Sequence, residues 1–165
     1  MAPSGAPHKW LTAALVSVGI FIALLDTTIV DIVLPKMMSS LDTDLYGVQW
    51  VVITYFLGSA IAMTAVGWVG EVVGHRNTYL AGLLLFVAMS ALAGMAPTIE
   101  AMVATRLFQG VAEGILIPVS MVILFEAFPP EEHGIAMGVF GLSASFAPAL
   151  GPALGGLITE TLSWR

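Results

Sequence analysis

The 165-residue sequence contains no cysteine, and only 10% of its residues are charged. Without cysteine it can form neither a disulfide framework nor a metal site built from thiolates. A soluble domain carries roughly 25% charged residues, which keep it dispersed in water. The shortage of charge therefore argues against a soluble protein and directs attention to the 58% of residues that are hydrophobic.

The hydrophobic residues are gathered into five long runs separated by short polar stretches, at about 10–34, 46–69, 78–96, 101–128 and 134–158. Each run is close to or above the roughly 20 apolar residues that span a bilayer as a helix. Strands of a membrane barrel would instead alternate in polarity over about ten residues. The sequence therefore predicts an all-α, polytopic transmembrane helix bundle.

The N-terminal run is too long for a cleaved signal peptide, whose apolar segment has about 7–15 residues. It also ends in Pro35-Lys36 rather than in a small-residue cleavage site. Residues 1–9 are predicted to form a short cytoplasmic tail and residues 10–165 the bundle. With five basic residues in all, the positive-inside rule is nearly balanced, and the positions of the three histidines favour a cytoplasmic N-terminus.

Two charged residues of opposite sign are expected at similar depth in the membrane. Asp26 lies eight residues before Leu34, or about 12 Å along a helix, and Arg106 lies nine residues after Pro97, or about 13 Å. Buried charges are usually tolerated as pairs, so a structural ion pair is one interpretation. The other is a proton-binding site, because a desolvated carboxylate near a movable cation changes its proton affinity.

Three further carboxylates lie within or beside the apolar runs. Glu113 follows Arg106 by seven residues, which places it on nearly the same helix face, and we expect it to point into the same cavity. Asp31 and Glu126 each stand shortly before a proline, so we expect both at helix ends near the membrane surface.

The fifth run is rich in residues that would break a soluble helix: Gly138, Gly141, Pro148, Gly151, Pro152, Gly155 and Gly156. In a membrane bundle, small residues let neighbouring helices approach closely, and those neighbours satisfy freed backbone groups. This pattern predicts a packing seam that can bend or rock. Gly67 and Gly74, near the turn after the second run, indicate a tight helix crossing in the same way.

Several motifs together resemble one family. The segment LDTTIVDIVLP at 25–35 resembles the first-helix signature of the fourteen-helix drug:proton antiporters of the major facilitator superfamily. Other segments are similar to its loop between helices two and three (GWVGEVVGHR, 67–76) and to its fourth-helix motif (RLFQG, 106–110). Gly138 and Ala147 with GPALGG at 151–156 resemble the antiporter motif of the fifth helix, and FPP at 128–130 and SWR at 163–165 also match this branch.

The resemblance implies that the chain is part of a secondary transporter with two halves that rock around a midplane site. It implies proton-coupled efflux of hydrophobic, cationic or amphipathic compounds, with Asp26 as the coupling carboxylate and Arg106 as its counter-charge. Gln109 and Glu113 would lie along the same pathway, although the family usually has a small residue at position 113. The conformational motifs would comprise Gly67, Glu71, Gly74, Arg76, Gly138, Gly151, Pro152, Gly155 and Gly156.

Family members have twelve or fourteen helices, so residues 10–165 are expected to form a partial N-terminal bundle. The expected location is the cell inner membrane, with the lipid bilayer, small substrates, protons and a periplasmic adaptor protein as partners. No nucleic acid, metal or organic cofactor is indicated, and no enzyme-like constellation is present. Two alternatives remain: an importer or facilitator of the same fold, and a non-transporting five-helix membrane protein.

Overall fold

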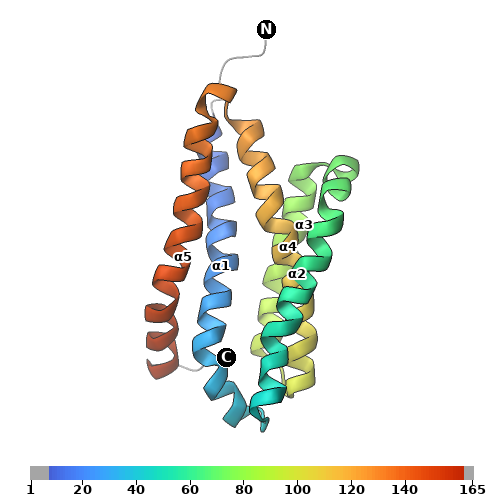
Figure 1. Cartoon of the computed structure of the whole chain (residues 1–165), viewed down its shortest axis with the longest axis vertical. Coiled ribbons are helices and arrows are strands. Elements are labelled where there is room, and N and C mark those ends of the chain that lie inside the picture. The colour runs from blue at the N-terminus through green and yellow to red at the C-terminus, as the bar shows by residue number, and fades with distance from the viewer. Residues whose placement is uncertain (1–7, 162–165) are drawn as a thin grey trace.

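A computed structural model describes residues 8–161, which form five long helices and one short 3-10 turn (Figure 1). The elements are α1 (Lys9–Ser40), α2 (Leu45–Val73), α3 (His75–Gly94), α4 (Ile99–Ala127), η1 (Pro130–Glu132) and α5 (His133–Thr161). All five helices are long and apolar enough to cross a membrane. The expected all-α polytopic bundle is therefore confirmed, and the protein is a multi-pass membrane protein.

Polar residues in the links determine where the helices begin and end. The Asp44 carboxylate accepts a hydrogen bond from the Gly47 amide at 2.7 Å, and the Thr98 hydroxyl accepts one from the Ala101 amide at 3.3 Å. These side chains satisfy amide groups that the first turns of α2 and α4 leave unpaired. Gly74 lies between α2 and α3 with φ at +90°, a conformation that a side chain would strain.

The first helix is longer than the sequence predicted. Its expected end at Leu34 is wrong, because α1 continues through Pro35 to Ser40. A proline within a helix removes one backbone hydrogen bond, and a packed membrane bundle tolerates this loss. Asp31 consequently lies in the body of α1 and not at its end, whereas Glu126 precedes the last residue of α4 as expected.

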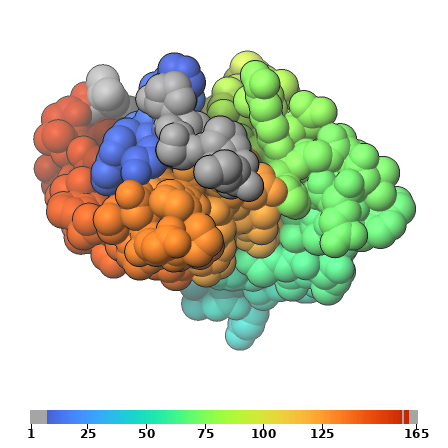
Figure 2. All heavy atoms as spheres, turned by 90° about the horizontal axis from the view of Figure 1, so that it is seen from above, coloured from blue at the N-terminus to red at the C-terminus, as the bar shows by residue number. Residues whose placement is uncertain are grey.

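Helix α4 is the centre of the bundle, packing against α2 and α3 on one side and α1 on the other (Figure 1). Helix α5 packs mainly on α1. At one end, Lys9 forms an ion pair with Glu132, and Trp10 meets the edge of Phe128 at 5.5 Å between ring centroids. Figure 2 shows this end, where the α4–α5 link (orange) lies beside the start of α1 (blue).

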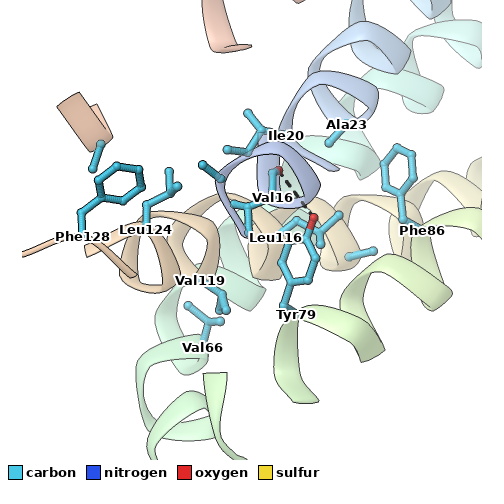
Figure 3. Close-up of a cluster of buried hydrophobic side chains, with 13 residues drawn as sticks. Val16, Ile20, Ala23, Val66, Tyr79, Phe86, Leu116, Val119, Leu124 and Phe128 are labelled. Atoms are coloured by element: carbon cyan, nitrogen blue, oxygen red, sulfur yellow. Dashed lines mark hydrogen bonds between the residues drawn. The ribbon is translucent and has the colours of Figure 1, made fainter. Parts of the chain in front are cut away.

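Two clusters of buried apolar side chains hold the helices together. The larger contains Ile20 on α1, Phe86 on α3 and Leu116 on α4, and the Tyr79 hydroxyl donates to the Val16 carbonyl at its edge (Figure 3). The smaller lies nearer the other end of the bundle and consists of Val33, Met37, Leu41, Val48, Val51, Ala96 and Met102. Between the two clusters lies a polar layer, with the buried residues Thr54 and Ser59 on α2 and Arg106 and Gln109 on α4, and the partly buried Asp26 on α1.

Candidate transport site

The central feature of the polar layer is a closed group of three side chains, Asp26 on α1 with Arg106 and Gln109 on α4. One guanidinium nitrogen of Arg106, Nη1, donates to Asp26 Oδ2 at 2.5 Å and to Gln109 Oε1 at 2.8 Å. Gln109 Nε2 donates to Asp26 Oδ1 at 3.0 Å. The ion pair allowed by the similar depths of Asp26 and Arg106 is thus present, and Gln109 fixes both partners.

Burial makes this ion pair energetically important. The side chain of Arg106 is 3% exposed and that of Asp26 is 19% exposed. Breaking a buried pair by removing one partner costs roughly 3–5 kcal/mol, because an uncompensated charge remains. Arg106 also keeps a buried Nε without a hydrogen-bond partner. The group therefore has a strong electrostatic preference for the paired state.

A cavity of about 190 Å³ reaches the Asp26 carboxylate between α1, α3 and α4. It extends from Asp26, Arg106 and Gln109 to Met37 and Gly94, near the end of the bundle opposite the start of α1. This space can hold water molecules. It is smaller than the roughly 300–1,000 Å³ of pockets for drug-sized ligands, so it suits water and protons better than a drug.

Glu113 does not line this cavity, contrary to the expectation from its spacing on α4. It is buried and faces α2, where its carboxyl interacts with the hydroxyls of Ser59 and Tyr55. The physical reason is the close approach of α2, which covers this part of α4. Glu113 therefore belongs to a separate polar contact beside the Asp26 group.

The tightest helix crossing in the bundle joins α2 and α4. A Cβ atom at Gly110 would overlap the backbone of Tyr55, and one at Gly114 would overlap the backbone of Ser59. Gly58 on α2 is in equally close contact with the backbone of Leu107. Sequence reasoning missed this crossing, although the four-residue spacing from Gly110 to Gly114 is the usual signal of one.

The fifth helix packs on the first through two of its glycines. A Cβ atom at Gly151 would overlap the Thr28 hydroxyl, and one at Gly155 would lie 3.5 Å from the Ile29 Cα atom. Within the part of the chain that the structure describes, a Cβ atom at Gly138 or Gly141 would meet nothing within 4 Å. Only part of the predicted seam is therefore in contact with α1, and Pro152 is exposed. Bending or rocking of α5 along this seam during transport remains a prediction.

Comparison with known proteins assigns the fold. The sequence profile described as Major Facilitator Superfamily matches residues 16–165. The chain belongs to the Major Facilitator Superfamily. The tetracenomycin C resistance and export protein of Streptomyces glaucescens is 32% identical to it over 99% of this chain and 32% of that protein. The multidrug export protein EmrB of Haemophilus influenzae is 33% identical over 93% of this chain and 30% of that protein.

A relative named only as an uncharacterized MFS-type transporter, YhcA of Bacillus subtilis, is 34% identical over 89% of this chain and 28% of that protein. The chain thus spans about 30% of the length of these curated relatives.

The loop motif of the superfamily lies at the exposed end of α2 and α3. Among the described residues, the tight crossing expected at Gly67 and Gly74 is not found, since a Cβ atom at either would meet nothing within 4 Å. Glu71 and Arg76 are exposed, and neither forms an ion pair among residues 8–161. The segment SWR at 163–165 lies outside the described residues.

One contact at this end was not predicted from the sequence. His75 Nδ1 lies 2.8 Å from Glu126 Oε1, which joins the start of α3 to the end of α4. Sequence reasoning had placed Glu126 only by its distance from a proline, and nothing in its spacing indicated a partner 51 residues away.

Proposed function

We propose that a chain of the relatives' length that begins with these helices, called the complete transporter below, exports hydrophobic or cationic small molecules in exchange for inward-moving protons. In this proposal Asp26 binds the proton. The observation that carries it is the buried Asp26–Arg106–Gln109 group at the inner end of a cavity too small for a drug. The names of two relatives, which describe export of tetracenomycin C and multidrug export, support the direction and the substrate class.

Protonation of Asp26 would change the energy of the whole bundle. It removes the negative partner of Arg106 and leaves a buried cation, which is the costly arrangement. A conformation that gives Arg106 another partner or more water then gains in population. A bias of about 1.4 kcal/mol changes the ratio of two conformations tenfold, so the roughly 3–5 kcal/mol cost of the unpaired charge shifts that ratio by about 10²–10³-fold.

The same proposal gives the bundle an orientation in the membrane. With the N-terminus in the cytoplasm, the cavity leads toward the outer surface of the inner membrane, where protons enter. The drug would bind on the faces of the helices that the rest of the complete transporter covers. Trp68 and Leu84, 69% and 71% exposed here, belong to the surface left to lipid or to those further helices.

Transport by the complete transporter in lipid vesicles tests the proposal. A proton gradient imposed on inside-out vesicles should drive accumulation of ethidium or a related hydrophobic cation, and Asp26→Asn should reduce this at least tenfold without reducing membrane insertion. Asp31→Asn is the matched control, since Asp31 is an exposed carboxylate on the same helix. Full proton-coupled transport by Asp26→Asn would refute the role of Asp26, and substrate movement in the same direction as the protons would indicate an importer.

A further inference from the structure

A second buried carboxyl, Glu113, lies beside the Asp26 group and has no role in the coupling described above. Only 5% of it is exposed, and its carboxyl interacts with the hydroxyls of Ser59 and Tyr55 across the α2–α4 contact. An ionisable group at this depth is energetically costly, and such residues usually have a function. The question is which ligand could reach it.

The packing around Glu113 excludes a substrate. Gly110 and Gly114 lie on α4 on either side of it, and their contacts bring the α2 backbone at Tyr55 and Ser59 against α4. Helices α2 and α4 run side by side in Figure 1 through this region. No small molecule can enter so close a crossing without separating the helices. A proton can reach Glu113 through the hydroxyl groups that contact it.

The charges around Glu113 determine its protonation state. The ionisable groups that face it are Asp26 from α1, Tyr55 from α2 and Arg106 from α4, and among residues 8–161 no titratable side chain of α3 or α5 interacts with it. One permanent cation, Arg106, therefore lies near two carboxyls, the partly buried Asp26 and the buried Glu113. Since Arg106 is bonded to Asp26, an ionised Glu113 would leave a net negative charge in the bundle. The neutral arrangement places one proton on Glu113.

Tyr55 connects the two carboxyls. Its hydroxyl interacts with Glu113 and accepts a hydrogen bond from Thr27, the neighbour of Asp26, at 3.3 Å. The guanidinium carbon of Arg106 lies 4.1 Å from the centre of the Tyr55 ring. The cation is thus in contact with the side chain that carries the Glu113 hydrogen bond, and loss of its partner at Asp26 favours a negative charge at Glu113.

We propose that Glu113 is a second proton-binding site, neutral while Asp26 pairs with Arg106 and ionised when Asp26 takes up a proton. An O–H bond forms at Asp26 first, which leaves Arg106 without its partner. The O–H bond of Glu113 then breaks as Glu113 becomes that partner, so the group holds one proton and no net charge before and after the exchange. Protons enter at Asp26 from the cavity and leave from Glu113. This inference rests on the proposed proton coupling at Asp26.

Infrared spectroscopy of the complete transporter in lipid vesicles tests the inference without measuring transport. A protonated carboxyl gives a carbonyl-stretching band that an ionised one lacks. The difference spectrum of wild type minus Glu113→Gln at neutral pH should show this band. The same substitution at Glu126, an exposed position on the same helix, should not change it. Tyr55→Phe should move the band to higher frequency, because the carboxyl loses a hydrogen bond.

Asp26→Asn tests the coupling between the two sites. With Asp26 neutral, Arg106 takes Glu113 as its partner, so the Glu113 band should fall to less than half its wild-type intensity. A wild-type spectrum without the band, or a band of full intensity in Asp26→Asn, would overturn the inference. Loss of transport alone would not overturn the inference about Glu113, because the band is measured in protein that is not transporting. Conversely, retained proton-coupled transport by Asp26→Asn would refute the proposed function, whereas the Glu113 band would still be present in the spectrum of the wild-type protein.

Discussion

The guanidinium carbon of Arg106 lies 4.1 Å from the centre of the Tyr55 ring, while the same side chain pairs with Asp26. One cation on α4 therefore contacts both α1 and α2. A cation over an aromatic ring contributes about 0.5–2 kcal/mol, more when water is excluded. The ring gives Arg106 a contact that persists when Asp26 is neutralised.

The Asp26–Arg106 pair should show strong coupling in a double-mutant cycle. Arg106→Ala alone leaves a buried carboxylate without its cation and should destabilise the protein by about 3–5 kcal/mol. The double variant with Asp26→Asn removes both charges and should be more stable than Arg106→Ala alone. Chemical unfolding in detergent measures this, and strictly additive effects would show that the two side chains do not interact.

The ring and the hydroxyl of Tyr55 should make separate contributions to the free energy of unfolding. Tyr55→Phe keeps the ring beneath Arg106 and should cost about 0.5–1.5 kcal/mol for its lost hydrogen bonds. Tyr55→Ala also removes the buried ring and should cost roughly 3–5 kcal/mol. Tyr46→Phe is the control because Tyr46 is 76% exposed. The unfolding free energy of this variant should stay within about 0.5 kcal/mol of wild type. Equal losses of stability in Tyr46→Phe and Tyr55→Phe would contradict the hydrogen-bonding role given to the Tyr55 hydroxyl.

The α2–α4 crossing should tolerate no side chain at Gly110. Gly110→Ala forces a Cβ atom into the Tyr55 backbone, and the resulting overpacking should destabilise by about 1–3 kcal/mol or more. Gly67→Ala, with nothing within 4 Å of the added atom, should be neutral or slightly stabilising. Thermal unfolding of the two variants provides the comparison. If both unfold alike, the close approach of the helices at Gly110 is not a determinant of stability.

The contact between α5 and α1 should matter for transport more than for insertion. Gly155→Leu in the complete transporter adds four heavy atoms beside Ile29 and Ile32, and it should reduce export more than Leu142→Ala at an exposed position. Because the seam is expected to slide, the added volume should favour one conformation over the other. Export rate and expression level are measured together. Normal insertion with full transport by Gly155→Leu would show that α5 is not the moving seam.

The number of helices and the positions of their charges could be predicted because both depend on local composition. A run of about 20 apolar residues satisfies its own backbone hydrogen bonds in lipid whatever its neighbours are. Equal depth of Asp26 and Arg106 follows from counting residues along two such runs. The end of α1 could not be predicted in this way, since tolerance of Pro35 depends on packing within the bundle.

The sequence by itself determined that five helices are long and apolar enough to cross a membrane and that Asp26 and Arg106 reach similar depths. Only the tertiary structure decided that Glu113 faces α2 rather than the cavity, and that Gly110 rather than Gly67 forms the tight crossing. The physical reason is that the environment of a side chain in a bundle depends on which neighbouring helix covers its face. That neighbour comes from a segment some fifty residues away in the sequence. For example, the Thr54 hydroxyl on α2 donates a hydrogen bond to the Val103 carbonyl on α4. Helical spacing alone does not specify such a neighbour.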